Sequence, residues 1–323
     1  MTSHADEHYM AAALALAERG VGCTLNSPSV GCIIVKDHIV LGRGWTGQGG
    51  RPHAEAMALS QAGSSATGAT IYVTLEPCAH VSERGPACTQ LLIEARPARV
   101  VGAIVDPDPR TSTKGFNQLK EAGITVETGV MASVARRQLA GFFSRLERQR
   151  PFVTLKLATS LDGKIALANG ESRWITGGSA RAHAHVERAR SDAILVGAAT
   201  VRIDVPALDV RLPGLENRSP RKVMLGSGTA PDGWDVLRSV DEISSLDCNM
   251  LLVEGGAKTA SAFLRAGLVD RLLLYRAPIL IGAGTACLGD IGLEDLKDAH
   301  GRWHNSLARR LGNDHVEVYD RAL

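Results

Sequence analysis

The chain has 323 residues, a length that allows two domains of ordinary size. Hydrophobic residues make up 45% of it, which is typical of a globular protein. The net charge of +2 is too small to attract a nucleic acid or an acidic membrane by bulk electrostatics. No apolar run approaches the roughly 20 residues that cross a bilayer. Residues 1–13 also lack the basic segment and apolar core of a secretory signal. We therefore expect a cytoplasmic protein that binds neither nucleic acid nor membrane.

The first half alternates predicted helices and strands with short loops between them. Helices are expected at residues 4–19, 52–63, 88–95, 116–122 and 134–149, and strands at 30–35, 39–41, 70–75, 99–105 and 125–127. This alternation predicts a layered α/β domain. A polar, arginine-rich segment at residues 148–151 is typical of a domain boundary, so we expect domains at 1–147 and 148–323.

The second half predicts another α/β domain. Strands are expected at residues 152–157, 193–196, 222–225, 250–253 and 271–275, of which 193–196 and 250–253 are expected to be buried, and helices are expected at 180–190 and 258–266. Residues 316–319 are expected to close the sheet as an edge strand. Residues 42–47 (GRGWTG) fit a dinucleotide-binding pattern, but their last glycine leads into Gly49-Gly50-Arg51-Pro52 and does not open a helix. We interpret them as a substrate-side loop.

A His and two Cys in the first half form a candidate zinc site. His53 is followed by Glu55, and Cys78 follows a proline and precedes Cys88 by ten residues. Three protein ligands leave the fourth zinc position open for water, as in catalytic sites. The His-x-Glu and Pro-Cys pattern is typical of zinc nucleobase deaminases, in which the Glu carries protons. We expect His53 and Glu55 in the first turn of a helix, and each Cys at the start of a helical turn that favours its thiolate.

Two alternatives stay open from the residues alone. One is a buried structural zinc, or no zinc at all; for a structural site, His80 is the nearest candidate for a fourth ligand. The other is a nucleic-acid editing deaminase, although 4% aromatic residues and a near-zero net charge speak against a base-stacking surface. The six cysteines are spread thinly, which argues for metal ligands and buried thiols rather than a disulfide framework.

Longer segments show a resemblance to a known family. They are PSVGC at 28–32, PHAE at 52–55, TLEPC at 74–78, SLDG at 160–163, SRWIT at 172–176, DAILVG at 192–197 and VEGG at 253–256. Together they resemble the bifunctional deaminase–reductases of riboflavin biosynthesis, from about residue 9 to residue 289. The second-half segments make this resemblance more specific than the zinc motif alone.

The resemblance implies a cytidine-deaminase-like three-layer domain followed by a dihydrofolate-reductase-like domain. It implies zinc-dependent deamination of 2,5-diamino-6-ribosylamino-4(3H)-pyrimidinone 5′-phosphate. Reduction of the ribose of 5-amino-6-(5-phosphoribosylamino)uracil by NADPH would follow. It also implies a homo-oligomer that pairs through the reductase domains and a small-molecule pyrimidine ribosyl-phosphate as its binding partner.

Site residues follow from the same resemblance. Zn²⁺ would be bound by His53, Cys78 and Cys88, with Glu55 as the catalytic proton carrier. Substrate contacts would be Arg84 in the deaminase and Lys156, Ser172, Arg188, Leu208, Arg211 and Glu254 in the reductase. NADPH contacts would be Ala158, Trp174, Thr200, Asp204, Ser227 and Gly256. The alternatives without a binding role are surface ion pairs for Arg188 and Arg211 and a core position for Trp174.

The chain also departs from the family pattern at several positions. Ser27 stands where Asn is usual, Thr46 where His is common, and Asp108 where Asn is expected. In the second half, Val205 and Gly226 each replace an Asp. These changes bear on substrate and cofactor contacts rather than on the zinc set.

Overall fold

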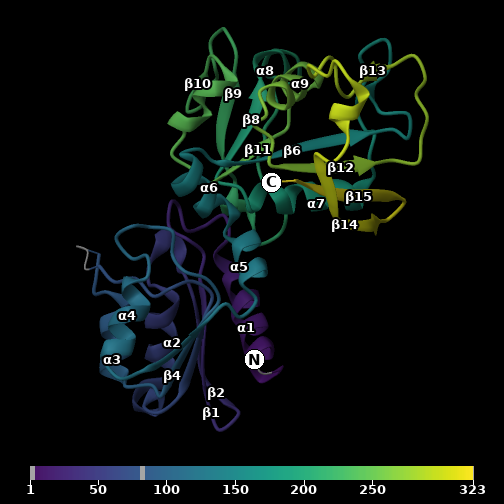
Figure 1. Cartoon of the computed structure of the whole chain (residues 1–323). Coiled ribbons are helices and arrows are strands. Elements are labelled where there is room, and N and C mark those ends of the chain that lie inside the picture. The colour runs from purple at the N-terminus through teal and green to yellow at the C-terminus, as the bar shows by residue number, and fades with distance from the viewer. Residues whose placement is uncertain (1–3, 81–83, 323) are drawn as a thin grey trace. The chain divides into compact units, whose positions relative to one another are not determined.

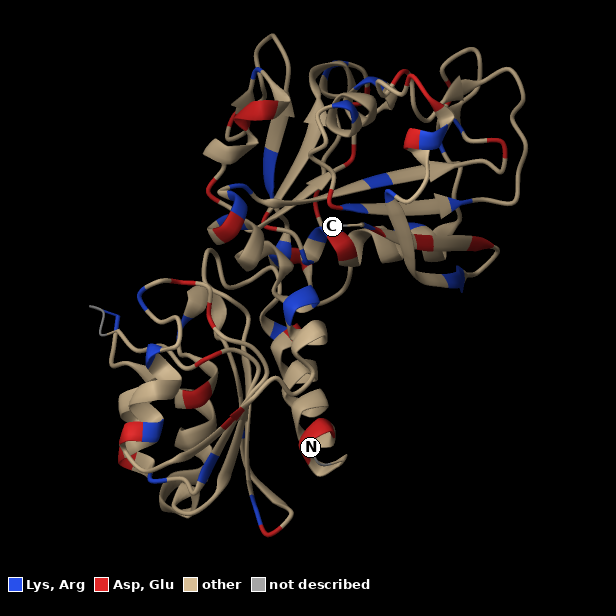
Figure 2. Ribbon diagram, viewed as in Figure 1, with Lys and Arg blue, Asp and Glu red and all other residues tan. Residues whose placement is uncertain are grey.

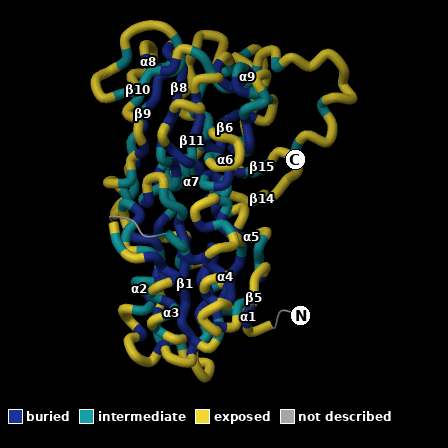
Figure 3. The backbone as a smooth tube through the Cα atoms, turned by 60° about the vertical axis from the view of Figure 1, so that its left-hand side comes forward, coloured by how far each residue is buried: buried dark blue, intermediate teal, exposed yellow. Residues whose placement is uncertain are grey.

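The computed structural model describes residues 4–80 and 84–322 of the chain. The chain divides into two compact units, residues 1–149 and residues 150–323 (Figure 1). Basic and acidic residues are interspersed over each unit, in keeping with the small net charge (Figure 2). In each unit the central strands are the most deeply buried elements (Figure 3). No helix within the described residues is long and apolar enough to cross a membrane.

The first unit is built on one mixed sheet, ordered β2-β1-β3-β4-β5 in the described part of the chain. β1 pairs antiparallel with β2 and β3, whereas β3, β4 and β5 run parallel. The strands are β1 (Gly31–Lys36), β2 (Ile39–Trp45), β3 (Thr70–Val73), β4 (Arg99–Gly102) and β5 (Thr125–Thr128). The helices are α1 (His4–Ala17), α2 (Ala54–Ala62), α3 (Cys88–Ala95), α4 (Lys114–Glu121), α5 (Ala132–Gln138) and α6 (Ala140–Arg148).

Helices cover both faces of this sheet, because successive side chains of a strand point to opposite sides. In β1, Cys32 and Ile34 pack in a cluster with residues of α2, α3, α4 and α6. Ile33 and Val35 pack in a second cluster with residues of α1 and α5. The unit is therefore the predicted three-layer α/β domain.

Glycines of β2 allow a helix to approach the sheet closely. A Cβ added to Gly44 would lie 2.0 Å from the Ala54 carbonyl oxygen, and one on Gly42 would lie 2.2 Å from that of Ala58. Both acceptors belong to α2, the helix that follows His53. The interpretation of residues 42–47 as a substrate-side loop was wrong, since most of the segment is strand and its first two glycines serve packing.

The second unit has a long sheet, ordered β10-β9-β8-β11-β6-β12-β15-β14 within residues 150–322. The strands from β10 to β12 run parallel, and β15 and β14 add antiparallel. They are β6 (Phe152–Thr159), β8 (Ala193–Gly197), β9 (Arg221–Leu225), β10 (Asp235–Leu237), β11 (Met250–Val253), β12 (Arg271–Arg276), β14 (Trp303–Leu311) and β15 (Asp314–Arg321). The helices are α7 (Gly178–Ala189), α8 (Ala198–Asp204) and α9 (Ala257–Arg265), and β7 (Lys164–Ala166) pairs with β13 (Thr285–Ala286).

Several predicted boundaries were wrong. The helix expected at 134–149 is divided into α5 and α6 at Leu139. The segment at 316–319 lies in β15, which is paired on both sides, and the sheet edge is formed by β14 instead. β14 was not predicted because seven of its nine residues are exposed and show no alternation of apolar and polar side chains.

The close approach at Gly44 gives a test of packing. Gly44→Ala should lower the free energy of unfolding by about 1–3 kcal/mol or more, because the new methyl group meets backbone that cannot move aside. The matched control is Arg43→Ala, an exposed neighbour in the same strand. Thermal or urea unfolding measures the difference. Equal stability of both variants would contradict this account of the β2–α2 contact.

Candidate active sites

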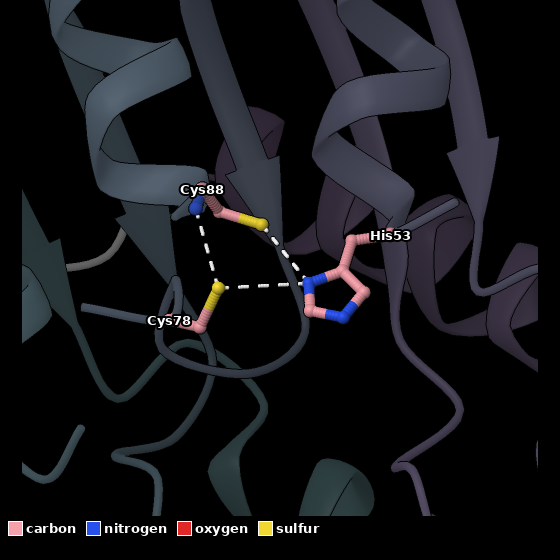
Figure 4. A group of neighbouring side chains, drawn as sticks. All are labelled: His53, Cys78 and Cys88. Carbon is pink, nitrogen blue, oxygen red and sulfur yellow. Dashed lines mark hydrogen bonds between the residues drawn. The ribbon is translucent and has the colours of Figure 1, made fainter. Parts of the chain in front are cut away.

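The three predicted zinc ligands come from three separate segments. His53 is the N-cap of α2 and has extended backbone angles, so it precedes the helix rather than lying in its first turn. Cys88 is the first residue of α3, as predicted. Cys78 lies in an irregular segment after β3, so the prediction that it begins a helical turn was wrong. Figure 4 shows His53 Nδ1 facing both sulfur atoms.

Their spacing fits a zinc ion. His53 Nδ1 lies 3.2 Å from Cys88 Sγ and 3.6 Å from Cys78 Sγ, and all three ligand atoms lie within 4.8 Å of one another. Tetrahedral zinc with ordinary Zn–N and Zn–S bonds separates its ligands by about 3.5–3.8 Å. Among the described residues this cluster has no fourth protein ligand. His80 instead faces the Thr111 hydroxyl at 3.3 Å, so a structural site with four protein ligands is not supported.

Local hydrogen bonds favour a thiolate in the cluster. A hydrogen bond from Cys88, aided by the imidazole of His53, outweighs burial and lowers the pKa of Cys78 to about 4. The backbone N–H of Cys88 also donates to Cys78 Sγ at 3.2 Å, which is the helix N-terminal interaction that stabilises thiolates. A deprotonated sulfur is the form that binds zinc.

Glu55 is a buried carboxylate beside this cluster. Its exposed fraction is 3%, and it follows His53 by two residues at the start of α2. Burial raises the pKa of Glu55 above its usual range, although the neighbouring His53 opposes the shift. A raised pKa makes a carboxylate a stronger base, which suits a group that accepts a proton and later returns it.

A cavity of about 150 Å³ opens beside the cluster. The family departures Ser27, Thr46 and Asp108 all line it, whereas Arg84 does not. The Thr46 hydroxyl donates to the Pro28 carbonyl and accepts from the Val30 amide, so it braces the cavity wall. The remaining lining residues are Asn26, Pro28, Val30, His53, Glu55, Leu75, Glu76, Cys78, His80, Asp106, Arg110 and Phe142.

Glu76 was not predicted as a site residue, yet it organises the wall of this cavity. Its carboxylate accepts backbone N–H groups of Asp106, Thr113 and Phe116 at 3.0–3.2 Å. Two of these donors lie at the start of α4, where unpaired N–H groups attract a carboxylate. Burial raises the pKa of the adjacent Asp106 to about 7. The only sequence signal was an acidic residue directly after a buried strand.

In the second unit, many of the predicted residues gather at the carboxyl ends of the parallel strands. Glu254 and Gly256 follow β11, Thr200 follows β8, Ser227 follows β9, and Lys156 and Ala158 lie in the last half of β6. These four strands are neighbours in the order β9-β8-β11-β6. Ligands of open α/β sheets bind outside the carboxyl ends of the strands. Gly256 is also the N-cap of α9, where free N–H groups suit a phosphate.

A buried ion pair between Arg188 and Glu254 lies in the middle of these strand ends. Arg188 from α7 donates to both carboxylate oxygens of Glu254 at 2.7 and 2.9 Å, and Lys156 Nζ lies 3.6 Å away. Burial alone would raise the pKa of Glu254, but Lys156 and Arg188 outweigh it and hold the pKa at about 2. Arg188 is therefore not a surface ion pair.

The other predicted residues are more exposed or do not bond to this pair. Trp174 is 66% exposed, with the Arg181 guanidinium 4.6 Å above its ring, so it is not a core residue. Arg211 pairs with Asp209 at 3.2 Å. Leu208 is buried, whereas Ser172, Asp204 and Ser227 are exposed.

Two connecting residues were not predicted. His185 Nδ1 lies 3.1 Å from the Asp209 carbonyl, which also accepts from Arg188, so it joins the Asp209–Arg211 segment to α7. The Asp162 carboxylate accepts the backbone N–H groups of Ile281 and Gly282 and thereby ties that loop to the SLDG turn. Neither contact has a local sequence pattern, because the partners lie far apart along the chain.

Comparisons with known proteins match both halves. Residues 3–104 match the cytidine and deoxycytidylate deaminase zinc-binding region, and residues 151–314 match the RibD C-terminal domain. The riboflavin biosynthesis protein RibD of Aquifex aeolicus is 36% identical over 99% of this chain and 100% of its own length. Its Escherichia coli counterpart is 39% identical over 91% and 94%.

Solved structures agree over nearly the whole chain. Form 1 of Acinetobacter baumannii RibD has a TM-score of 0.90 and 35% identity, covering 98% of this chain and 99% of its own. A Thermotoga maritima protein described as a diaminohydroxyphosphoribosylaminopyrimidine deaminase/5-amino-6-(5-phosphoribosylamino)uracil reductase has a TM-score of 0.88 and 30% identity, with 99% of each chain covered.

Fold, site and comparisons together define a two-domain enzyme in which a zinc-dependent deaminase is joined to an NADPH-dependent reductase. The chain belongs to the RibD family of bifunctional riboflavin biosynthesis enzymes. The predicted fold class, the two activities and the two cofactors are thereby confirmed.

Zinc content tests the ligand set. Cys78→Ser and Cys88→Ser should each reduce bound zinc well below the roughly one ion per chain expected of the parent, because each removes one of three ligands. Cys23→Ser is the matched control, since Cys23 is a free thiol outside the cluster. Atomic emission on purified protein gives the ratio. Retention of a full zinc ion by Cys78→Ser would rule out this ligand assignment.

The Glu254 pair predicts a pH-dependent stability. Because the folded-state pKa is lowered from 4.5 to about 2, its stabilisation is present above pH 4.5 and is lost as the pH falls toward 2. Glu254→Gln should lower the free energy of unfolding by about 3–5 kcal/mol at pH 7, because it leaves Arg188 buried without its carboxylate partner. The gap to the parent should narrow below pH 4.5.

Urea unfolding at pH 7, 5 and 3.5, followed by tryptophan fluorescence, measures this gap. Three of the four tryptophans, Trp174, Trp234 and Trp303, lie in the second unit and report on it. Glu216→Gln, at an exposed acid of the same unit, is the control. A gap that stays constant across these pH values would show that the pair is not the source of the stabilisation.

Proposed function

We propose that the first unit deaminates 2,5-diamino-6-ribosylamino-4(3H)-pyrimidinone 5′-phosphate. The second unit then reduces the ribose of 5-amino-6-(5-phosphoribosylamino)uracil to a ribityl chain with NADPH. The observation that carries the proposal is the His53, Cys78 and Cys88 cluster beside buried Glu55, in the same chain as the Glu254 edge. The name of the Thermotoga maritima relative, which pairs these two reactions, supports the choice of substrates.

In the deamination, His53, Cys78 and Cys88 would hold a zinc ion, which would supply Lewis-acid activation of the attacking water. Glu55 would accept one proton of that water as its oxygen adds to the amino-bearing ring carbon, and would pass the proton to the ring nitrogen. It would then take the second proton from the new hydroxyl group and give it to the amine, so that the C–N bond breaks, ammonia leaves and a carbonyl remains. Its raised pKa matches this double role, because the group must take and give a proton at similar pH.

In the reduction, NADPH would supply a hydride to C1′ of the sugar, while the C1′–O bond of the ring opens and its oxygen takes a proton from solvent. Lys156 and Glu254 are proposed to hold the ribose, and Arg188 orients Glu254 through its two hydrogen bonds. Ser172, Leu208 and Arg211 are proposed to complete the substrate side. The nucleotide is proposed to lie along Ala158, Trp174, Thr200, Asp204, Ser227 and Gly256, with its pyrophosphate at the N-terminus of α9.

We further propose a homo-oligomer that pairs through the second units, and a cytoplasmic location. β14 leaves an open sheet edge in the second unit, and such edges favour pairing with another chain. All six cysteines are free thiols, which suits a reducing compartment. We also propose domain limits at 1–147 and 148–323, two residues before the division between the two compact units.

Glu55→Gln tests the catalytic role. The variant should release ammonia at least about 100-fold more slowly, because the amide cannot accept a proton. It should keep its zinc, and it should oxidise NADPH normally when given the deaminated substrate. Ammonia release, metal content and NADPH absorbance are measured on the same preparation. Unchanged ammonia release would mean that the zinc is structural and that the deaminase assignment is wrong.

A further inference from the structure

The deaminase cavity is rich in carboxylates and has one strong cation in its lining. Glu55, Glu76, Asp106 and Asp108 contribute acidic side chains. Within the described residues, Arg110 is the single Lys or Arg that lines this space. A substrate with a phosphate group is repelled by such a surface unless a cation meets it, since like charges in a partly desolvated site are costly. Arg110 is therefore the candidate cation for a sugar-phosphate ligand in this cavity.

Arg84, the residue suggested by the family resemblance, is placed differently. Its guanidinium donates to the carbonyl of Gly49, in the short turn that precedes His53. It is absent from the cavity lining formed by the described residues. Arg84 therefore contacts the turn that leads to His53 and α2, whereas Arg110 lines the cavity itself.

Arg110 is held in position by Asp108. Its Nε lies 3.0 Å from both carboxylate oxygens and its Nη2 lies 2.5 Å from Oδ2, while its backbone N–H donates to Oδ1 at 2.9 Å. Its side chain is nevertheless 68% exposed. Its Nη1 group makes no hydrogen bond within the described part of the chain. The guanidinium is thus oriented on one side and open on the other.

The segment that carries the pair is itself fixed to the zinc loop. Asp106 Oδ1 accepts the N–H of Asp108, and Glu76 accepts the N–H of Asp106. Glu76 precedes the zinc ligand Cys78 by two residues. Two prolines, Pro107 and Pro109, further limit the freedom of this segment. The distance from Arg110 to the metal site is therefore set by a short hydrogen-bonded path.

We propose that Arg110, oriented by Asp108, binds the 5′-phosphate of the pyrimidine substrate in the deaminase site. The proposal rests on the proposed function, because it assumes a phosphorylated substrate in this cavity. A guanidinium binds phosphate through paired charged hydrogen bonds, and an orienting carboxylate fixes the plane of the guanidinium beforehand. Asp108 stands where the family has Asn, and its role in this chain is to orient the guanidinium of Arg110.

The test compares phosphorylated and dephosphorylated forms of the diaminopyrimidinone substrate. The parent should deaminate the phosphorylated form with the higher kcat/KM. Arg110→Met should lower kcat/KM for that form by about 10- to 100-fold, the range for one charged hydrogen-bonding partner. It should leave the dephosphorylated form nearly unchanged. Arg110→Lys should keep part of the preference, and Arg84→Met should keep most of it.

Zinc content and NADPH oxidation by each variant show that it is folded. A phosphate preference that survives in Arg110→Met overturns the proposal. Loss of the preference in Arg84→Met alone assigns the phosphate to Arg84 and also overturns it. If the zinc-loaded parent releases ammonia from neither form, the proposed function fails, and the phosphate site is judged by binding instead.

Binding is followed on enzyme in which cobalt replaces zinc, because the absorption of thiolate-bound cobalt changes when a ligand enters the deaminase site. Uridine 5′-phosphate should perturb the spectrum at a concentration at least about tenfold lower than uridine does, by the same charged contact. Arg110→Met should remove this difference and Arg84→Met should keep it. An equal difference in the parent and in Arg110→Met, or none in the parent, overturns the proposal.

Discussion

The deaminase site depends on one buried carboxylate that is not catalytic. Glu76 leaves the end of β3 and accepts three backbone N–H groups from residues 106–116. A hydrogen bond to a charged group contributes about 1.5–3 kcal/mol, so three of them make this a strong link between distant segments. It joins the Cys78 segment to the start of α4 and to the cavity wall. Gly115 permits the contact, because a Cβ there would lie 2.1 Å from the Pro77 carbonyl oxygen.

The reductase site rests on a comparable arrangement, in which cationic side chains take the place of backbone N–H groups around the carboxylate. A parallel sheet brings the ends of β6, β8, β9 and β11 to one edge, and Glu254 is the acidic residue at its centre. Arg188 and Lys156 keep that acid ionised although it is buried. Each active site is thus built on a buried carboxylate whose partners come from distant segments. This explains how a chain with a net charge of +2 creates local fields strong enough to orient charged ligands.

The sequence predicted those features that depend on residue type and local pattern. Strands such as β11 and helices such as α3 were located because apolar runs and breakers lie next to one another. The ligands His53, Cys78 and Cys88 were recognised because few residue types bind zinc, and the structure brings their ligand atoms together. The family resemblance added the reductase activity of the second domain and its cofactor.

Features that depend on long-range contacts were missed. Glu76 bonds to partners 30–40 residues away, so no local pattern marks it. Glycine residues 42 and 44 were assigned to a loop because their purpose, the approach of α2, exists only in three dimensions. β14 was missed because it lacks an apolar face. Arg84 and Arg110 carry the same charge, but only Arg110 lines the cavity formed by the described residues. The sequence therefore indicated the type of chemistry. The directions of the side chains, which only the structure gives, show which arginine lines the cavity.

The most direct measurement follows ammonia and NADPH together on the phosphorylated diaminopyrimidinone. The account predicts that ammonia appears first and that one ammonia is released and one NADPH is oxidised for each substrate consumed. Without NADPH, ammonia release should continue and the deaminated sugar phosphate should accumulate. NADPH oxidation that precedes ammonia release, or zinc-loaded enzyme that produces no ammonia, would contradict the account.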